Sequence, residues 1–397
     1  MKKGWQTRKI GDVCRLMTGG TPSKAKPEYF GGEIRWLVSG DIHQGEIFDC
    51  EGRISDAGMK NSNAKLLPIN SVMIALNGQG KTRGTVALLR MRATCNQSLV
   101  SIYPNDPDML LPEFLYANLH GRYQEIRQMT GDSGNDRRGL NMGLIESIEI
   151  PIAPLPEQRR IGSILDEAFE GMTTAAANAE KNLQNARAIF ESHLQSVFTQ
   201  RGPGWVETKL GEAYDVRDGT HDSPKYHATG YPLITSKNLK RDGLTFDDVK
   251  LISEQDYTKI NERSAVHKGD VLFAMIGTIG NPTLVEVEPN FAIKNVALFK
   301  NPNGQSGAFL KHYLDSGMVI SKMMKEAKGT TQKFVGLGYL RGFPINLPPL
   351  TTQLKLVEEL NELSEETQRL AHLYERKRAA LEALKKSLLR QAFSGAL

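Results

Sequence analysis

Residues 155–200 carry the pattern that most restricts the fold, a heptad repeat with no proline between Glu157 and Arg201. Mostly apolar or small side chains recur at alternating steps of four and three residues from Ile161 to His193, which is the period of a coiled coil. The same frame returns 195 residues later, from Leu356 to Leu388. The sequence therefore predicts two copies of one long helix, over 155–201 and 349–397.

The start and end of each predicted helix repeat as well. Pro154-Leu155 and Gln158 at the first start correspond to Pro349-Leu350 and Gln353 at the second, and Phe198 corresponds to Phe393 near the two ends. The seam positions predicted to pair the helices are Ile161, Leu165, Ala175, Asn182 and Ile189 in the first copy and Leu360, Thr367, Leu370, Tyr374 and Leu384 in the second.

Two globular segments, 1–154 and 202–348, precede the two helices and also resemble each other. Trp5 and Lys9 recur as Trp205 and Lys209, and the apolar run ending in MIALNG recurs as the run ending in FAMIG. Short strand-like runs alternate with turns, and a helix is predicted over 112–129 with Pro112 in its first turn. We therefore predict an α+β (mixed α/β) chain of two globular domains separated by two long helices, with an internal pseudo-two-fold repeat.

Composition limits the class of protein. A chain of 397 residues with 40% hydrophobic and 24% charged residues is typical of a folded soluble protein with two or three domains. The start MKKGWQTRKIGDV has no apolar segment typical of a signal peptide, and Cys14, Cys50 and Cys95 lack metal or disulfide spacing. These features predict a reduced, cytoplasmic location. A net charge of +5 permits nucleic-acid binding without demonstrating it.

The loop NGQGKTRG, residues 77–84, is the most informative segment of the first half. Gly80-Lys81-Thr82 resembles the end of a phosphate-binding loop, but Ala75 stands where that motif needs a glycine. A hairpin turn and a DNA-contacting loop both remain open, since Asn and Gln suit adenine edges while Lys and Arg suit guanine or phosphate. The candidate DNA contacts in this half are Thr21, Lys24, Asn77, Gln79, Lys81, Thr82, Arg83, Arg137 and Arg138.

The segment DGTHDSPK, residues 218–225, raises the question of catalysis in the second half. Asp218, His221 and Asp222 are close in sequence, but no partner cluster follows at ligand spacing. A capped turn and a DNA contact are therefore favoured over an acid–base or metal site. The candidate DNA contacts here are Thr220, His221, Lys225, Lys237, Asn238, Thr331 and Lys333.

The two helices are predicted to pair as an antiparallel coiled coil, because alignment about their centres places small residues opposite large ones. The predicted facing pairs are Ala168 with Leu381, Ala175 with Tyr374, Ala179 with Leu370, Ala186 with Leu363, and Asn182 with Thr367. A helix of this length spans roughly 65 Å and is predicted to act as a spacer. The alternative, that each helix packs on its own domain, remains open. Further apolar helix residues are predicted to bind helices of other chains: Ile164, Leu183, Phe190, Leu194, Val197, Leu373 and Leu389.

An ordered set of segments carries a resemblance to a known family. These are GGTPSK and YFGGEIRWLVSGDI within 19–42, DGTHDSPKY at 218–226, the helix starts PLPEQ and PLTTQ, and the closing SLLRQAFSGAL. Together they make the chain resemble the specificity (S) subunit of type I restriction–modification enzymes over essentially its whole length.

The resemblance implies a non-catalytic subunit in which each globular half is a target recognition domain for one part of a bipartite DNA site. It implies helices that dock two methyltransferase (modification) subunits and two restriction subunits. S-adenosylmethionine, ATP and Mg²⁺ are then cofactors of those partners, and none is expected in this chain. The residues agree, since no Asn-Pro-Pro-aromatic methyltransferase motif is present. The alternative is a coiled-coil scaffold that binds proteins, for which partner binding would not depend steeply on salt.

Overall fold

The computed structural model describes residues 3–78, 80–130, 139–200, 202–241, 243–301, 304–329 and 333–397. Its contacts divide the chain into two compact units. Unit 1 comprises residues 1–178 and 377–397, and unit 2 comprises residues 179–376. The predicted division into two domains and two separate helices stays a prediction, because the unit boundaries fall inside both long helices.

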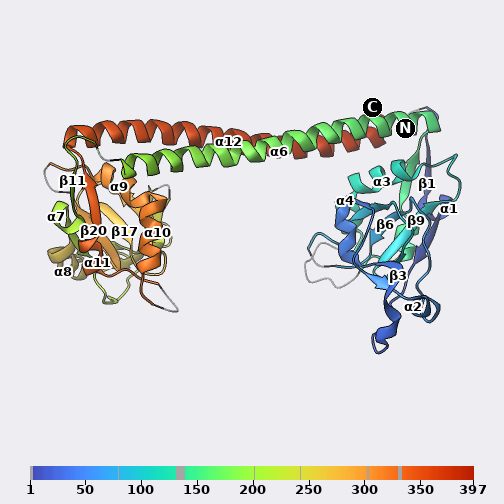
Figure 1. Ribbon diagram of the computed structural model, residues 1–397, viewed down its shortest axis with the longest axis horizontal. Coiled ribbons are helices and arrows are strands. Elements are labelled where there is room, and N and C mark those ends of the chain that lie inside the picture. The colour runs from blue at the N-terminus through green and yellow to red at the C-terminus, as the bar shows by residue number, and fades with distance from the viewer. Residues whose placement is uncertain are drawn as a thin grey trace. The chain divides into compact units, whose positions relative to one another are not determined.

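Unit 1 is built on a five-stranded sheet in the order β2-β9-β6-β7-β4, beside a three-stranded sheet β5-β3-β8 and the pair β1-β10. Figure 1 labels β1, β3, β6 and β9 among these strands. The strands are β1 (Gln6–Lys9), β2 (Cys14–Thr18), β3 (Phe30–Leu37), β4 (Glu46–Ile47), β5 (Arg53–Ile54), β6 (Val72–Ala75), β7 (Val86–Leu89), β8 (Thr94–Cys95), β9 (Leu99–Pro104) and β10 (Glu149–Ile152). The helices are α1 (Ile10–Val13), η1 (Pro27–Tyr29), η2 (Ser39–Gln44), α2 (Asp56–Lys60), α3 (Pro112–Gly121), α4 (Tyr123–Gln128) and α5 (Met142–Glu146).

Unit 2 repeats this plan with a four-stranded sheet β12-β20-β17-β18, a three-stranded sheet β16-β13-β19 and the pairs β11-β21 and β14-β15. Its strands are β11 (Val206–Lys209), β12 (Asp215–Asp218), β13 (Tyr231–Ile234), β14 (Leu239–Lys240), β15 (Gly243–Leu244), β16 (Lys250–Ile252), β17 (Val271–Ala274), β18 (Gly280–Leu284), β19 (Ala292–Ile293), β20 (Val296–Lys300) and β21 (Pro344–Leu347). Its helices are α7 (Leu210–Ala213), η3 (Ser236–Asn238), α8 (Glu254–Ser264), α9 (Gly307–Asp315), α10 (Gly317–Glu326) and α11 (Leu337–Gly342). The predicted internal repeat is confirmed.

Burial explains why the central strands read as continuous apolar runs. Every residue of β6, β7 and β17 is buried, so both faces of these strands are covered and no polar alternation is required. The predicted helix over 112–129 is wrong in one respect, because it is interrupted at Arg122 and forms α3 and α4. None of the helices among the described residues is both long and apolar enough to cross a membrane.

The predicted long helices are confirmed as α6 (Leu155–Thr199) and α12 (Leu350–Ser394), each of 45 residues. In unit 1 they run antiparallel, since Arg160 donates to the carbonyl of Leu397 (2.8 Å) while Lys385 lies over the ring of Phe169 (4.9 Å). In unit 2 the later residues of α6 pair with earlier residues of α12, as in the Arg187–Glu375 ion pair (2.9 Å).

The predicted register of the helices is wrong. It placed Arg187 opposite Glu362 and Phe169 opposite Ala380, but Arg187 reaches Glu375 and Phe169 reaches Lys385. The facing pairs predicted from that register are therefore displaced along α12. The register was predicted by placing small residues of one helix opposite large residues of the other. It failed because the globular cores supply further apolar partners, which an alignment of the helices alone omits.

Two seam positions and three of the seven predicted docking positions also need correction. Ile189 and Leu384 are 50% and 52% exposed, so they do not lie buried between the helices. Leu183, Leu194 and Leu389 are instead buried within their own units. The remaining seam positions are buried or half-buried: Ile161, Leu165, Ala175, Asn182, Leu360, Thr367, Leu370 and Tyr374.

Each globular part is held by the start of one long helix and the end of the other. In unit 1, Phe114 of α3 packs edge-to-face against Trp5 (6.2 Å between centroids) and against Phe393 of α12 (5.1 Å). In unit 2, Phe309 of α9 packs in the same way against Trp205 (6.5 Å) and Phe198 of α6 (5.4 Å). The predicted correspondence of Phe198 with Phe393 thus has a structural basis.

A buried glutamine at each helix start ties the helix to the globular part. Gln158 accepts a hydrogen bond from the Leu111 amide (2.9 Å) and donates to the carbonyls of Met109 (2.8 Å) and Ala153 (2.7 Å). Gln353 makes the corresponding bonds in unit 2, accepting from the Ser306 amide (3.0 Å) and donating to the Pro348 carbonyl (2.9 Å).

Replacing Gln158 with leucine is expected to destabilise unit 1. Gln158 is 1% exposed, so Gln158→Leu leaves buried backbone groups of the 109–111 segment without partners. We expect the free energy of unfolding to fall by about 2 to 4 kcal/mol, measured by chemical denaturation. Gln184→Leu, at an exposed position of α6, is the matched control. Equal stability of the two variants would contradict the anchoring role.

Candidate nucleic-acid interface

The loop 77–84 joins β6 to β7 as a hairpin and is held from one side by α4. Tyr123 donates to the carbonyl of Lys81 (3.1 Å), and Arg127 donates to the carbonyl of Gly80. The Thr82 hydroxyl lies 3.0 Å from Nε2 of His43 in η2. The backbone at Gly80 and Lys81 is therefore anchored, while the side chains of Asn77 and Lys81 remain exposed. The described part of the loop is thus structured and projects polar groups.

The predicted contact residues Thr21 and Lys24 lie in a second loop, at the same edge of the globular part as loop 77–84. The Gly20 amide donates to the Cys95 carbonyl (2.9 Å), and Thr21 donates to Oε1 of Gln97 (2.7 Å). The Leu76 amide, directly before loop 77–84, donates to the carbonyl of Ser98 (2.9 Å). We call the described parts of loops 19–24, 77–84 and 96–98 the first loop edge.

Unit 2 brings the corresponding segments together. The Thr220 amide donates to the Ile293 carbonyl (3.0 Å), and Nδ1 of His221 lies 2.8 Å from Oδ1 of Asn295. The Gly277 amide donates to the Lys333 carbonyl (2.9 Å). The described parts of loops 219–225, 275–279, 294–295 and 328–335 form what we call the second loop edge.

Charge at the second loop edge is organised around Asp218. Its carboxylate accepts from Arg263 of α8 (2.6 Å) and lies 2.8 Å from Nε2 of His221. The Lys294 ammonium donates to the hydroxyl of Ser223. In the described part of the chain, no group of three or more His, Cys, Asp or Glu side chains is placed to hold a metal ion. The Asp218–His221 pair orients an amide here rather than a nucleophilic hydroxyl or thiol.

The structure corrects one predicted contact residue. Asn238 is 5% exposed, accepts from the Thr235 amide (3.0 Å) and donates to the Thr245 carbonyl (3.2 Å), so it caps a turn and is unavailable to DNA. Lys24, Lys225, Lys237 and Lys333 are exposed, and Arg83 and Thr220 are half-buried. The predicted contacts Gln79, Arg137, Arg138 and Thr331 lie outside the described residues.

Two neighbouring amides were absent from the predicted contacts, Gln97 and Asn295. Each lies in the short link between a buried strand and the next strand of the main sheet, β8–β9 in unit 1 and β19–β20 in unit 2. The sequence signal was an amide inside each of the matching runs TCNQSLVSI and FAIKNVALF. The link has three residues in unit 1 and two in unit 2, so an ungapped alignment of the runs places Gln97 opposite Lys294.

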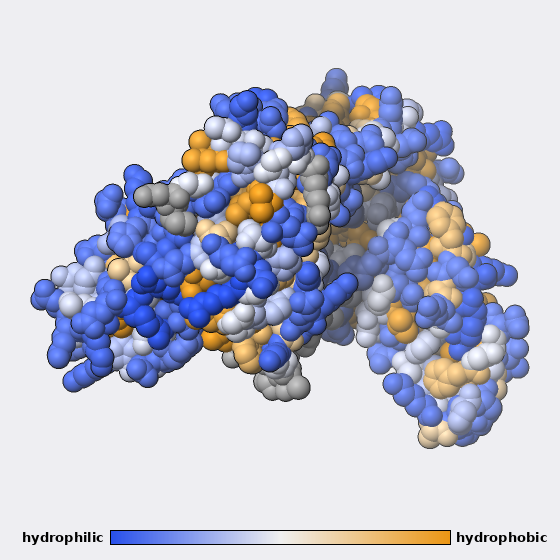
Figure 2. Space-filling view, turned by 60° about the vertical axis from the view of Figure 1, so that its left-hand side comes forward, coloured by the Kyte–Doolittle hydropathy of each residue, from blue (hydrophilic) through white to orange (hydrophobic). Residues whose placement is uncertain are grey.

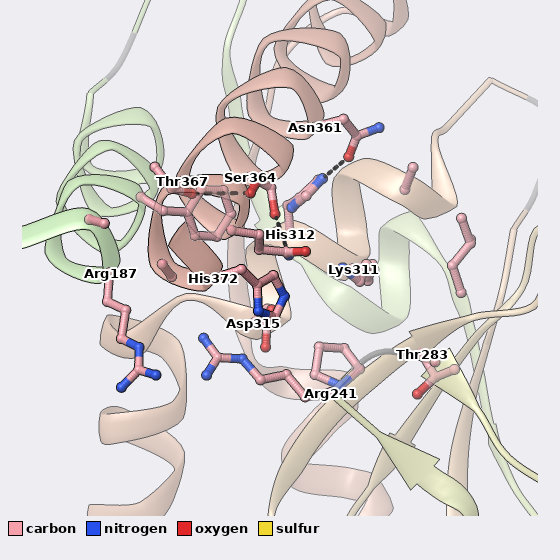
Figure 3. Close-up of a pocket in the computed structure, with 18 of the residues that line it drawn as sticks. Arg187, Arg241, Thr283, Lys311, His312, Asp315, Asn361, Ser364, Thr367 and His372 are labelled. Atoms are coloured by element: carbon pink, nitrogen blue, oxygen red, sulfur yellow. Dashed lines mark hydrogen bonds between the residues drawn. The ribbon is translucent and has the colours of Figure 1, made fainter. Parts of the chain in front are cut away.

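A separate cleft in unit 2 lies between α9 and the two long helices (Figure 3). His312 is 3% exposed, and its Nε2 lies 2.9 Å from Oδ1 of Asn361. Burial lowers the pKa of His312 to about 4 and raises the pKa of Asp315 above its usual range. Among the described residues, the cleft lining includes none from the second loop edge. The cleft therefore belongs to the attachment of the helices rather than to the interface.

Comparison with known proteins assigns this architecture to a class. The family model for the type I restriction modification DNA specificity domain matches residues 2–184 and 203–376. The chain is 23% identical to the MjaIX specificity subunit of Methanocaldococcus jannaschii, over 87% of this chain and 84% of that protein. It is 28% identical to the EcoR124I/EcoR124II specificity subunit of Escherichia coli, over 43% of this chain and 42% of that protein.

Solved structures show the same fold. The HsdS subunit from Thermoanaerobacter tengcongensis superposes with a TM-score of 0.67 at 18% identity, covering 100% of this chain and 98% of that chain. A chain from a structure that describes complex assembly of the type I R-M system superposes with a TM-score of 0.81 at 19% identity. The match covers 100% of this chain and 99% of that chain.

These matches define a protein with two DNA specificity domains in tandem. The chain belongs to the type I restriction modification DNA specificity family. It is a non-catalytic DNA-recognition subunit with two target recognition domains, as the resemblance implied. The scaffold alternative is not favoured, because both globular parts match the DNA specificity domain.

The buried His312 is expected to make unit 2 acid-sensitive. An unfolded histidine takes up a proton near pH 6.5, whereas His312 in the folded unit does so only near pH 4. The free energy of unfolding should therefore fall as the pH is lowered across this window, by up to about 3 kcal/mol. Chemical denaturation of the wild type and of His312→Gln at several pH values measures this term as their difference. Identical pH dependence of the two proteins would contradict it.

Proposed function

We propose that each unit reads one part of a bipartite DNA target through its loop edge. The observation that carries this proposal is that the same backbone arrangement presents different side chains in the two units. Thr21 and Gln97 stand at the first loop edge where His221 and Asn295 stand at the second. Two copies of one scaffold with different polar groups are suited to reading two different base sequences.

Exposed cations at both edges support contact with the phosphate backbone. Lys24 and Lys81 are exposed at the first loop edge, and Lys225 and Lys333 at the second. Lys237, in η3, is exposed as well. Hydrophilic side chains also cover most of the face seen in Figure 2, with apolar residues scattered among them. Phosphate contacts set position and affinity, and the neutral polar groups supply base discrimination.

The partners we propose are two methyltransferase subunits and two restriction subunits, acting in the cytoplasm. S-adenosylmethionine would serve the methyltransferases, and ATP and Mg²⁺ the restriction subunits. The related chain from the type I R-M system structure belongs to a complex assembly, which supports docking of this kind. The exposed helix residues Ile189, Leu354, Leu373 and Leu384 offer apolar contacts to partner helices.

Deletion of this chain from its host is expected to abolish methylation at one split DNA motif. The physical reason is that two separate reading edges specify two base sequences with unread base pairs between them. Methylome sequencing with and without the gene measures the effect, and restoring the gene serves as the control. A methylome that does not change would contradict the proposed function, and loss of an undivided motif would contradict the assignment of one part to each unit.

Polar substitution of the exposed helix leucines is expected to weaken docking of the methyltransferase subunits. Leu373 and Leu384 are 55% and 52% exposed, so Leu373→Gln and Leu384→Gln should leave the folded chain intact. Loss of one buried leucine contact corresponds to roughly a tenfold or greater weakening. Calorimetric titration with the partner subunit measures this. Ala380→Gln, at an exposed position of α12, is the control, and an equal effect there would contradict specific docking.

A further inference from the structure

One exposed or half-exposed amide in each unit is fixed by a side chain from the facing loop. In unit 1 the Thr21 hydroxyl donates to Oε1 of Gln97 at 2.7 Å. In unit 2 the His221 ring lies 2.8 Å from Oδ1 of Asn295. Gln97 is exposed and Asn295 is half-buried, so neither amide is sequestered in a core.

The two pairs occupy equivalent places in the fold. A Cβ on Gly19 would lie 1.7 Å from the Cys95 carbonyl oxygen, and one on Gly219 would lie 2.2 Å from the Ile293 carbonyl oxygen. Glycine is therefore required at both positions, because each loop crosses directly over the end of the β8 or β19 strand. Thr21 and His221 each follow this crossing by two residues, and Gln97 and Asn295 each follow the crossed strand by two.

The hydrogen bond leaves a defined recognition pattern at Gln97. With Thr21 donating to one lone pair of Oε1, the Nε2 group keeps its donors and Oε1 keeps its second lone pair. A donor beside an acceptor on one planar amide matches N7 and the N6 amino group of adenine in the major groove. Because the amide is held in one orientation, it cannot rotate by 180° and exchange its amino group with its carbonyl oxygen.

The His221 ring that contacts Asn295 is itself held on its other side. Nε2 of His221 faces the Asp218 carboxylate, which Arg263 also contacts. Among the described residues, the other charged side chains of this edge are Lys294, bonded to Ser223, Asp222 and Lys225 of the His221 loop, and Lys328 and Lys333. Nδ1 of His221 lies 2.8 Å from Oδ1 of Asn295, so the ring, held by Asp218 at its other nitrogen, fixes the amide in one orientation.

We propose that Gln97 and Asn295 are specificity-determining residues, each reading one base pair of its half of the target, and that Thr21 and His221 are their positioning residues. The inference rests on the proposed function, because it assigns residues to the same two loop edges. It adds that the base preference of each half depends on the contact between the amide and its positioning residue.

Truncation of each amide tests the assignment. Gln97→Ala removes the first amide, and Asn295→Gly removes the second without strain, because Asn295 has a φ of +55° that glycine adopts freely. The complex of each variant with its methyltransferase subunits is incubated with duplexes randomised around the wild-type target, and the methylated products are sequenced. We expect loss of about tenfold or greater discrimination at one base pair, in the first half for Gln97→Ala and in the second half for Asn295→Gly.

The positioning residues are tested on the same library by removing the hydrogen-bonding group of each. His221→Ala should broaden the base preference at the Asn295 position and leave the first half of the target unchanged. Thr21→Val should broaden the base preference at the Gln97 position and leave the second half unchanged. Gln6→Ala and Gln255→Ala, exposed amides outside the two loop edges, are the matched controls.

The outcomes separate the inference from the proposed function. Methylation of wild-type targets by the truncation variants with unchanged base preference overturns the inference and leaves the proposed function standing. A wild-type complex that methylates no split motif overturns the proposed function itself. Equal relaxation by the control variants also overturns the assignment, since the effect would then not belong to these amides.

Discussion

The architecture depends on one aromatic contact in each globular part. There, a phenylalanine packs against both a tryptophan and the end of a long helix. Phe114 contacts Trp5 and Phe393, which joins residues from both ends of the chain into one core. Edge-to-face aromatic pairs contribute about 0.5 to 1.5 kcal/mol each beyond the area they bury. The end of α12 therefore packs on the first globular part, and this is why residues 377–397 belong to unit 1. Unit 2 has the same arrangement with Phe198 of α6, which precedes the globular part of that unit in the chain.

Anchoring by Gln158 and Gln353 lets the loop edges vary without disturbing the helices. Each glutamine satisfies buried backbone groups between a globular part and its helix, so the orientation of the two is set by bonds far from the loops in sequence. The loops in turn need only close backbone crossings such as the one at Gly19. Their side chains can then differ freely, as Thr21 and His221 do. Separation of a shared scaffold from variable polar groups is the physical condition for a family of readers with different targets.

The sequence predicted the features that follow from periodicity and repetition. Its predictions failed where a globular core also contacts the two helices. Heptad spacing and the matching starts at Gln158 and Gln353 predicted both long helices. The register failed because Leu194 and Leu389 face globular cores, which a comparison of two helices alone leaves out. Ile189 and Leu384 follow the heptad yet stand half exposed, since a period shows which residues share a helix face but not which face is covered. The interruption at Arg122 was likewise hidden in a run with good helical propensity.

The candidate site shows the same division between local pattern and tertiary contact. Lysines and glycines marked the loops, so Lys24, Lys81 and Lys225 could be named from composition alone. Asn238 was misjudged because its side chain satisfies the backbone of its own turn, which an exposed-loop reading does not reveal. Gln97 and Asn295 were missed because their links differ by one residue in length, and only the carbonyls crossed by Gly19 and Gly219 bring them into correspondence. Which loop residue of one unit corresponds to which of the other is set by where the backbone segments cross, not by position along a strand. Corresponding residues must therefore be found from three-dimensional contacts.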